Sequence, residues 1–283
     1  MRRFDRKFGR DFLKGIPEGP GVYFFRGVSG EVLYVGKAVN LRRRLAQYRN
    51  AVRKKRSRKM MKVVSLAESL TWETSDTELD ACLNEIRLIQ ELRPPHNIAG
   101  AYSFLYPLVG MKKKATNVEL GGSLSFPEIH FCFTTSPGEL SEYRFFGAFR
   151  SRETTAEAFF SLMRLLRFVG HPVSSGGLTA KKRPAYSYIF GFRRLPALWF
   201  SLWEEFFRGR SLSALEELTL TILGNAGARA RAEEVQEDIN SLHRFWKDEA
   251  SLLAAAIDAT GYGTYPVPQS DRDPLFLRFR MAP

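Results

Sequence analysis

The stretch PGVYFFRGVSGEVLYVG, residues 20–36, carries the strongest structural signal in the first part of this chain. It holds two short runs rich in β-branched and aromatic residues, on either side of a turn-forming segment from Gly27 to Gly30. Such runs around a glycine-containing turn are typical of a β-hairpin. We therefore expect two antiparallel strands, with Tyr23 on the first and Tyr34 on the second.

The residues after Gly36 change from a strand pattern to helical and mixed patterns. Leu41, Leu45, Tyr48 and Val52 recur at the spacing of one face of an amphipathic helix, and arginines occupy its other faces. Residues 63–74 predict a third strand. Ser75 with Glu78 looks like a capping box that opens a helix to about Leu92, and a double proline at 94–95 ends it.

These elements predict a domain over residues 12–99 of the α/β (α+β) class, with a small central antiparallel three-stranded sheet flanked by helices. A second, mixed but mostly helical region is expected over residues 100–283. Within it, 126–135 and 143–149 alternate like strands, and 154–168 is helical. Residues 195–208 and 212–257 read as helices with a break at 224–227, and an irregular tail is expected from residue 261.

The charge of the chain is concentrated near its N-terminus. The 283 residues carry a net charge of +13, and residues 1–62 alone hold 19 lysines and arginines against four acidic residues. The remaining residues therefore sum to −2, which predicts that a polyanion, nucleic acid first, binds the first quarter. Two cysteines exclude a disulfide framework, and no apolar run reaches the length of a membrane span. We expect a cytoplasmic protein without a membrane partner.

Two tripeptides carry a family resemblance. Gly21-Val22-Tyr23 and Tyr34-Val35-Gly36, followed by Lys37, resemble the paired signature of GIY-YIG nucleases, with valine in place of each isoleucine. The segment from Asn40 to Arg44, then Tyr48, Glu85 and Asn97, comes next in the family's order. IPEGPGVYFF, LYVGKAVNLRRRLAQY and TELDACLNEIRLIQELRPPHN are similar to the N-terminal nuclease domain of the excision-repair subunit UvrC and its shorter homologue Cho, over residues 14–98.

Glu85 is the carboxylate on which this interpretation depends. On a helical wheel it lies at the flank of the apolar stripe, so it faces inward and must be protonated, paired or bound to a metal. A structural salt bridge is the alternative to a metal. The resemblance implies that Glu85 is the single protein ligand of a divalent cation, Mg²⁺ or Mn²⁺, with water and phosphate as the other ligands.

The resemblance also assigns roles to the tyrosines, which could otherwise be ordinary sheet aromatics. It makes Tyr23 the general base for the attacking water and Tyr34 the residue that positions water or phosphate, although which tyrosine takes the proton stays open. A phenolate needs a nearby cation, and Lys37 is the candidate.

Three further residues complete the expected site. Arg44 shares the inner edge of the basic helix with Leu41 and Tyr48, so its guanidinium could hold a phosphate. Tyr48 packs there with its hydroxyl reaching the site. Asn97 matches the family's asparagine and is expected to brace the site by bonding backbone.

The sequence predicts a metal-dependent DNA endonuclease that makes single-strand incisions at damaged or branched DNA, in nucleotide excision repair. The residues expected to contact DNA are Arg42, Arg43, Arg49, Arg53, Lys54, Lys55, Arg56, Arg58 and Lys59. A non-catalytic DNA-binding module and a mobile-element or restriction nuclease are the alternatives. A UvrB-like partner is left open, because residues 211–257 only vaguely resemble the helices through which UvrC meets UvrB.

Overall fold

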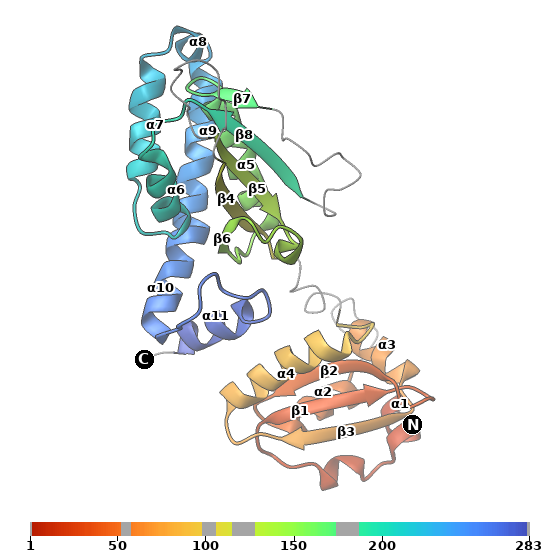
Figure 1. Ribbon diagram of the computed structural model, residues 1–283. Coiled ribbons are helices and arrows are strands. Elements are labelled where there is room, and N and C mark those ends of the chain that lie inside the picture. Colours follow the sequence, from red (N-terminus) through yellow and green to blue (C-terminus); the bar gives the residue numbers. More distant parts are fainter. Residues whose placement is uncertain (1, 52–57, 98–105, 115–127, 174–186, 282–283) are drawn as a thin grey trace. The chain divides into compact units, whose positions relative to one another are not determined.

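The structure is a computed structural model that describes residues 2–51, 58–97, 106–114, 128–173 and 187–281. The chain divides into two compact units, whose main spans are Met1–Phe104 and Leu105–Leu275, and each is described by itself (Figure 1). The boundary expected between residues 99 and 100 falls in a stretch outside the described residues, so it stays a prediction.

A three-stranded antiparallel sheet forms the centre of the first unit. Strands β1 (Gly21–Arg26) and β2 (Val32–Ala38) form the expected hairpin, and β3 (Ser69–Thr74) pairs with the other side of β1. The order is therefore β2-β1-β3, with β2 at an edge. The strand expected over 63–74 is wrong in its first half, because helix α3 (Arg58–Leu66) buries Val63 and Val64 before β3 begins.

Helices cover both faces of this sheet (Figure 1). Successive residues of a strand point to opposite faces, so Tyr23 and Phe25 pack with α1 (Arg3–Phe8), α2 (Leu41–Arg49) and α3. Val22 and Phe24 pack on the opposite face against Leu88 and Ile89 of α4 (Glu78–Leu92). A short 3-10 turn, Phe12–Gly15, connects α1 to the sheet.

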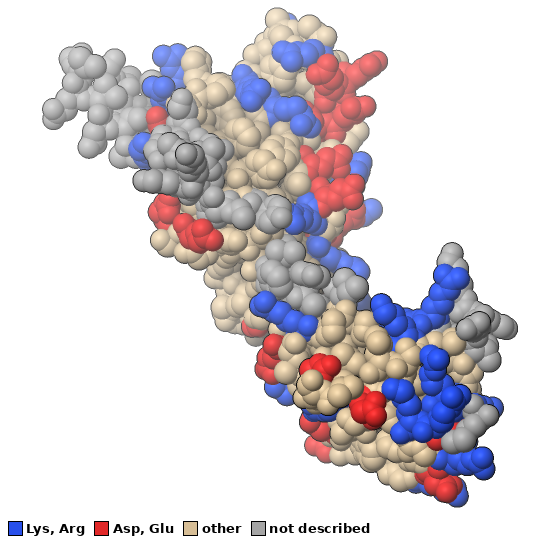
Figure 2. Space-filling model, turned by 90° about the vertical axis from the view of Figure 1, so that its right-hand side faces the viewer, with Lys and Arg blue, Asp and Glu red and all other residues tan. Residues whose placement is uncertain are grey.

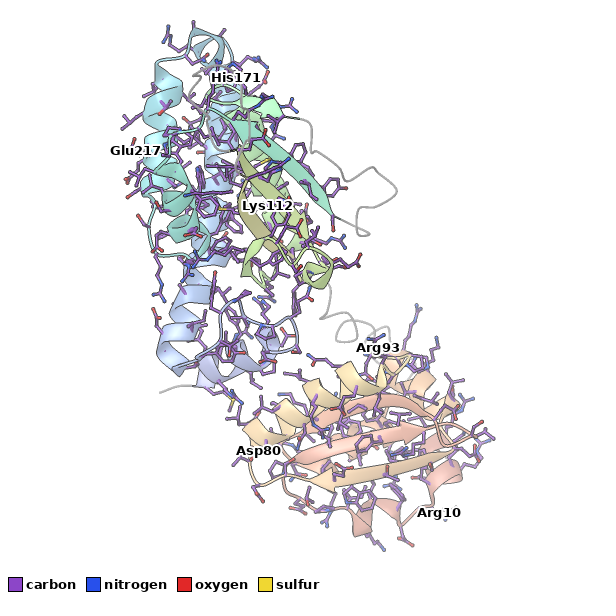
Figure 3. All side chains as sticks on the ribbon, viewed as in Figure 1. Arg10, Asp80, Arg93, Lys112, His171 and Glu217 are labelled. Atoms are coloured by element: carbon purple, nitrogen blue, oxygen red, sulfur yellow. The ribbon has the colours of Figure 1, made fainter. Side chains whose placement is uncertain are left out.

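The two ends of α4 explain where that helix lies. The Thr77 hydroxyl accepts a hydrogen bond from the amide of Asp80, so the capping box expected at Ser75 and Glu78 is displaced by two residues. Thr77 sits closer to the first apolar residue that the helix buries, Ala81. At the other end, Arg93 adopts a left-handed conformation, and the prolines after it cannot continue a helix. Asp80 and Arg93 mark the two ends in Figure 3.

The second unit contains a five-stranded antiparallel sheet of order β6-β4-β5-β8-β7. The strands are β4 (Leu108–Lys114), β5 (Glu128–Thr134), β6 (Arg144–Gly147), β7 (His171–Val173) and β8 (Tyr188–Arg193). The two strands expected from the sequence correspond to β5 and β6. Strands β4, β7 and β8 were not predicted from the sequence. Strand β4 ends in charged residues, and β7 and β8 adjoin stretches with a loop-like composition.

Helices make up the rest of the second unit and the end of the described chain. They are α5 (Arg152–Leu166), α6 (Trp199–Phe207), α7 (Ser213–Leu223), α8 (Ala226–Arg229), α9 (Ala232–Phe245), a π-helical turn at Trp246–Ala250, α10 (Ser251–Thr260) and α11 (Arg272–Met281). The expected irregular tail is wrong where α11 forms. Among the described residues, no helix combines the length and apolar character that a bilayer span requires.

Candidate active site on the edge strand

A pocket of about 350 Å³ lies at the edge strand β2, where residues from α2 and α4 meet. Strand alternation directs Tyr34 and Gly36 toward the α2 face, and Val35 and Lys37 toward the α4 face. The pocket therefore collects side chains from both faces of the sheet. The lining includes Tyr23, Tyr34, Lys37, Asn40, Arg43, Arg44, Gln47, Glu78 and Glu85.

The two motif glycines are required by close packing. A Cβ added to Gly36 would lie 2.4 Å from the Tyr23 hydroxyl oxygen and 2.9 Å from Cε1 of Tyr34. A Cβ added to Gly21 would lie 2.3 Å from the Glu73 carbonyl oxygen. A Cβ cannot lie this close to other atoms at either position. The glycines therefore let the tyrosine rings pack against Gly36 and let β3 pack against Gly21.

The Tyr23 hydroxyl is held inside the protein. It lies 3.0 Å from the Tyr48 hydroxyl and accepts a hydrogen bond from Nε of Arg44 at 3.2 Å. Nη1 of Arg44 donates to Oε1 of Gln47 at 2.7 Å, which fixes the guanidinium plane. Burial raises the pKa of Tyr23 to about 12, even though the hydrogen bond from Arg44 acts in the opposite direction.

Tyr34 is placed differently from Tyr23. Its side chain is half-buried and lines the pocket, and Nζ of Lys59 lies 4.9 Å from the centre of its ring. Lys59 approaches from α3, so its charge lies beside the pocket. Tyr48 lies on the buried face of α2, and burial raises its pKa above the ordinary value of a tyrosine.

Glu85 projects from α4 into the pocket. Its Oε1 accepts a hydrogen bond from the backbone amide of Lys37 at 3.1 Å, which fixes the carboxylate against β2. Burial raises the pKa of Glu85, although the amide and the charge of Lys37 oppose that shift. The salt-bridge alternative finds no support, because Glu85 has no ion-pair partner among the described residues.

Lys37 does not lie where the sequence analysis expected. Its Nζ donates to Sγ of Cys82 at 2.6 Å, on the α4 face, whereas the cation at the Tyr23 hydroxyl is Arg44. Strand alternation is the reason, since Lys37 and Tyr34 are an odd number of residues apart. Burial tends to lower the pKa of Lys37, but the bond to Cys82 and the charge of Glu85 raise it above its ordinary value.

Glu78 and Cys82 belong to the site although the sequence analysis did not assign them to it. Glu78 lines the pocket, and Cys82 holds the Lys37 side chain beside it. They precede Glu85 by seven and three residues, so helical spacing places all three on the same side of α4. This spacing is the feature of the sequence from which Glu78 and Cys82 could have been assigned to the site.

Asn97 braces β2 as expected. Its side chain accepts a hydrogen bond from the Val35 amide at 2.9 Å and donates one to the Val35 carbonyl at 2.8 Å. The residue bonds only backbone in these contacts, so it fixes the edge strand on which Tyr34 and Lys37 lie.

Several arginines expected to contact DNA are engaged within the protein. Arg42 forms an ion pair with Glu18 at 2.6 Å, and Arg49 donates two hydrogen bonds to the buried carboxylate of Asp5. Arg43, Arg58 and Lys59 are exposed. Arg53, Lys54, Lys55 and Arg56 lie outside the described residues. Lysine and arginine side chains gather on one side of the first unit (Figure 2).

Comparison with known families identifies the domain that contains this pocket. The model of the UvrC-like GIY-YIG domain matches residues 19–98, which contain both motif glycines, both strand tyrosines, Glu85 and Asn97. The chain carries a UvrC-like GIY-YIG domain. This confirms the resemblance, and the GIY-YIG domain is an endonuclease domain with the expected fold class.

Curated relatives match stretches of this chain that differ in length. UvrABC system protein C of Zymomonas mobilis is 31% identical over 176 residues, which cover 62% of this chain and 24% of the relative. UvrABC system protein C of Haloarcula marismortui is 41% identical over 103 residues, 35% of this chain and 17% of the relative. The matched part is thus less than a quarter of the length of these curated relatives.

A solved structure also matches the GIY-YIG domain. It is the GIY-YIG N-terminal endonuclease domain of UvrC from Thermotoga maritima bound to its catalytic divalent cation, magnesium. It is 33% identical, the match covers 31% of this chain and 93% of that chain, and the TM-score is 0.28.

The GIY-YIG pocket fits a divalent cation held by few protein ligands. In the part of the chain that the structure describes, no three His, Cys, Asp or Glu side chains gather closely enough to hold a metal by themselves. Mg²⁺ commonly binds through one or two carboxylates and keeps waters or substrate phosphates as its other ligands. Glu85 supplies one inward carboxylate that no described cation pairs with, beside a pocket with room for water and phosphate.

Proposed function

We propose that the pocket on β2 hydrolyses a phosphodiester bond in DNA, with Glu85 holding the divalent cation. The observation that carries this proposal is the convergence of one inward carboxylate, two tyrosines and a fixed guanidinium on the same pocket. A bound cation would stabilise the charge that develops on the phosphate. Arg44 and Arg43 line the same pocket and would contact that phosphate.

The tyrosines divide into two roles in this proposal. Tyr23 is fully buried, its oxygen is engaged by Tyr48 and Arg44, and burial raises its pKa to about 12. These features favour a positioning role for Tyr23 rather than the general-base role first expected. Tyr34 is half-buried and lines the pocket, so it is better placed to take the proton of the attacking water.

The biological setting is proposed from the relatives alone. Proteins named UvrABC system protein C match part of this chain, and we place the incision in nucleotide excision repair. A UvrB-like partner, the preferred DNA structure and a cytoplasmic location remain predictions. The non-catalytic alternative finds no support in the described residues, since Glu85 and both tyrosines are present in one pocket.

The test is an incision assay on end-labelled plain, nicked, bubble and lesion-bearing duplexes in Mg²⁺ or Mn²⁺. Wild type should nick at least one substrate and lose that activity in EDTA. Tyr34→Phe should slow incision by about 100-fold or more, since general bases contribute about 10² to 10⁴. Tyr23→Phe should slow incision by less than this, as expected of a positioning residue. Failure of every substrate, with a damage-recognition complex added, would favour the non-catalytic alternative.

A further inference from the structure

A second pocket, of about 270 Å³, lies between helix α1 and the C-terminal end of α2. We call it the α1 pocket. Its polar lining is Arg2, Arg3, Arg49 and Asn50, and its floor is apolar, including Phe4 and Tyr48. None of the described residues that line it is acidic. The lining chemistry therefore suits an anion.

Helix α1 is anchored to the domain, although it is only six residues long. Phe4 is 1% exposed, and the ring of Phe8 packs against Phe25 of β1, with centroids 6.2 Å apart. Asp5 accepts two hydrogen bonds from Arg49, one of them at 3.1 Å from Nη2, and hydrogen bonding to Arg49 holds the pKa of Asp5 below its ordinary value. The Asp5–Arg49 pair thus uses one arginine of α2 to fix α1 in place.

The anchored helix presents new cations beside α2. Arg2 donates to the side-chain oxygen of Asn50, which holds its guanidinium at the pocket. Arg3 is exposed and has no ion-pair partner within the described part of the chain. Arg49 is neutralised by Asp5, so Arg2 and Arg3 supply a net charge of about +2 to an anion there. Arg10 lies at the periphery of the same unit (Figure 3).

The α1 pocket and the pocket on β2, which we call the catalytic pocket, are connected through helix α2 and through two tyrosines that contact each other. Arg44 and Gln47 of α2 line the catalytic pocket, whereas Tyr48 and Arg49 line the α1 pocket. The Tyr48 hydroxyl contacts that of Tyr23, which lines the catalytic pocket. From Arg44 to Asn50 the helix rises by about 9 Å at 1.5 Å per residue. A strand lying along α2 could therefore reach both pockets with phosphates that are a few nucleotides apart.

We propose that the α1 pocket binds a backbone phosphate of the substrate DNA, within a few nucleotides of the phosphate that is cut. This inference rests on the proposed function, because it assumes that the catalytic pocket holds a DNA strand. It adds Arg2 and Arg3 to the DNA-contacting residues and gives Arg49 an indirect role. The anchored phosphate would fix the register of the strand across α2.

The test is a scan of neutral methylphosphonate linkages, placed singly one to six nucleotides from the cut on either side. Binding is measured in EDTA with wild type and with Arg2→Ala/Arg3→Ala. One linkage within a few nucleotides of the cut should weaken wild-type binding about 10-fold and leave the variant's binding unchanged. The variant should also reduce the salt slope by about 1, since each neutralised phosphate contributes about 0.9.

Lys14→Ala/Arg87→Ala is the matched control. It also removes two exposed cations, but each is paired with a carboxylate, Lys14 with Asp11 at 2.7 Å and Arg87 with Glu91 at 3.0 Å. It should retain the wild-type profile. If wild type incises DNA, but its affinity depends on the position of the methylphosphonate in the same way as that of Arg2→Ala/Arg3→Ala, this inference alone is overturned. Differing profiles without incision overturn the proposed function alone, and a wild type that binds no DNA overturns both.

Discussion

Replacing Gly36 by alanine tests whether the geometry of the tyrosines controls incision. The added Cβ would lie 2.4 Å from the Tyr23 oxygen, and ordinary contact begins at 3.4 Å. The tyrosine must therefore move by about 1 Å. That oxygen is also fixed by Tyr48 at 3.0 Å and Arg44 at 3.2 Å, so the shift disturbs both hydrogen bonds. Misplacement of this size can reduce a rate by about 100-fold, and overpacking costs about 1–3 kcal/mol.

Two readouts separate the effects of Gly36→Ala. The initial incision rate should fall by about 100-fold. Hydrogen exchange of the β1 and β2 amides should accelerate by about 5- to 150-fold, which corresponds to about 1–3 kcal/mol. Gly19→Ala is the control, because a Cβ there meets no atom within 4 Å and its backbone needs no positive φ. Wild-type incision by Gly36→Ala, or a similar loss in the control, would show that the position of the Tyr23 hydroxyl does not control incision.

Three other changes test separate parts of the site. Burial raises the pKa of Glu85 in the folded protein, so the ionised carboxylate lowers the stability of the fold above that pKa. In the absence of metal, Glu85→Gln should therefore melt at a higher temperature than wild type at about pH 8. At about pH 4 the substitution should not raise the melting temperature. Asn97→Ala leaves the buried Val35 amide and carbonyl without their partners, which should cost about 2–4 kcal/mol, seen as faster exchange of the β2 amides. Cys82→Ala removes the hydrogen bond that raises the pKa of Lys37, while the charges of Glu85 and Glu78 remain, so the pKa of the Lys37 ammonium, followed by NMR, should be lower than in Cys82→Ser. An unchanged melting temperature at pH 8, unchanged exchange, or the same Lys37 pKa in the two cysteine variants would contradict each expectation in turn.

The hairpin, the third strand and helix α4 could be predicted because local signals agree with the packed structure. The β-rich runs around a glycine turn, the apolar period after Gly36 and the double proline at 94–95 each act over a few residues. The start of α4 shows the limit, since Ser75 and Thr77 are both suitable caps and only the burial of Ala81 selects Thr77. In the second unit, β4, β7 and β8 depend on pairing with β5 and with one another, which no local pattern reveals.

The site was less predictable than the fold because its residues come from both faces of the sheet. Spacing correctly placed Arg44 with Tyr48 and turned Glu85 inward, but Lys37 was assigned to the tyrosines when alternation directs it to Cys82. Charge density suggested that every arginine of the basic helix meets DNA. Arg42 and Arg49 instead pair with Glu18 and Asp5, which lie more than twenty residues away in the chain. Such pairings depend on tertiary structure.

The most direct test of the account is the ratio of initial incision rates of wild type and Glu85→Gln in Mg²⁺, on the duplex that wild type cuts best. The substitution keeps the size of the side chain and an oxygen that can accept the hydrogen bond from the Lys37 amide. It removes the negative charge that would hold the cation. The account predicts a ratio of about 10³ or more with DNA affinity unchanged. A ratio near one would contradict it.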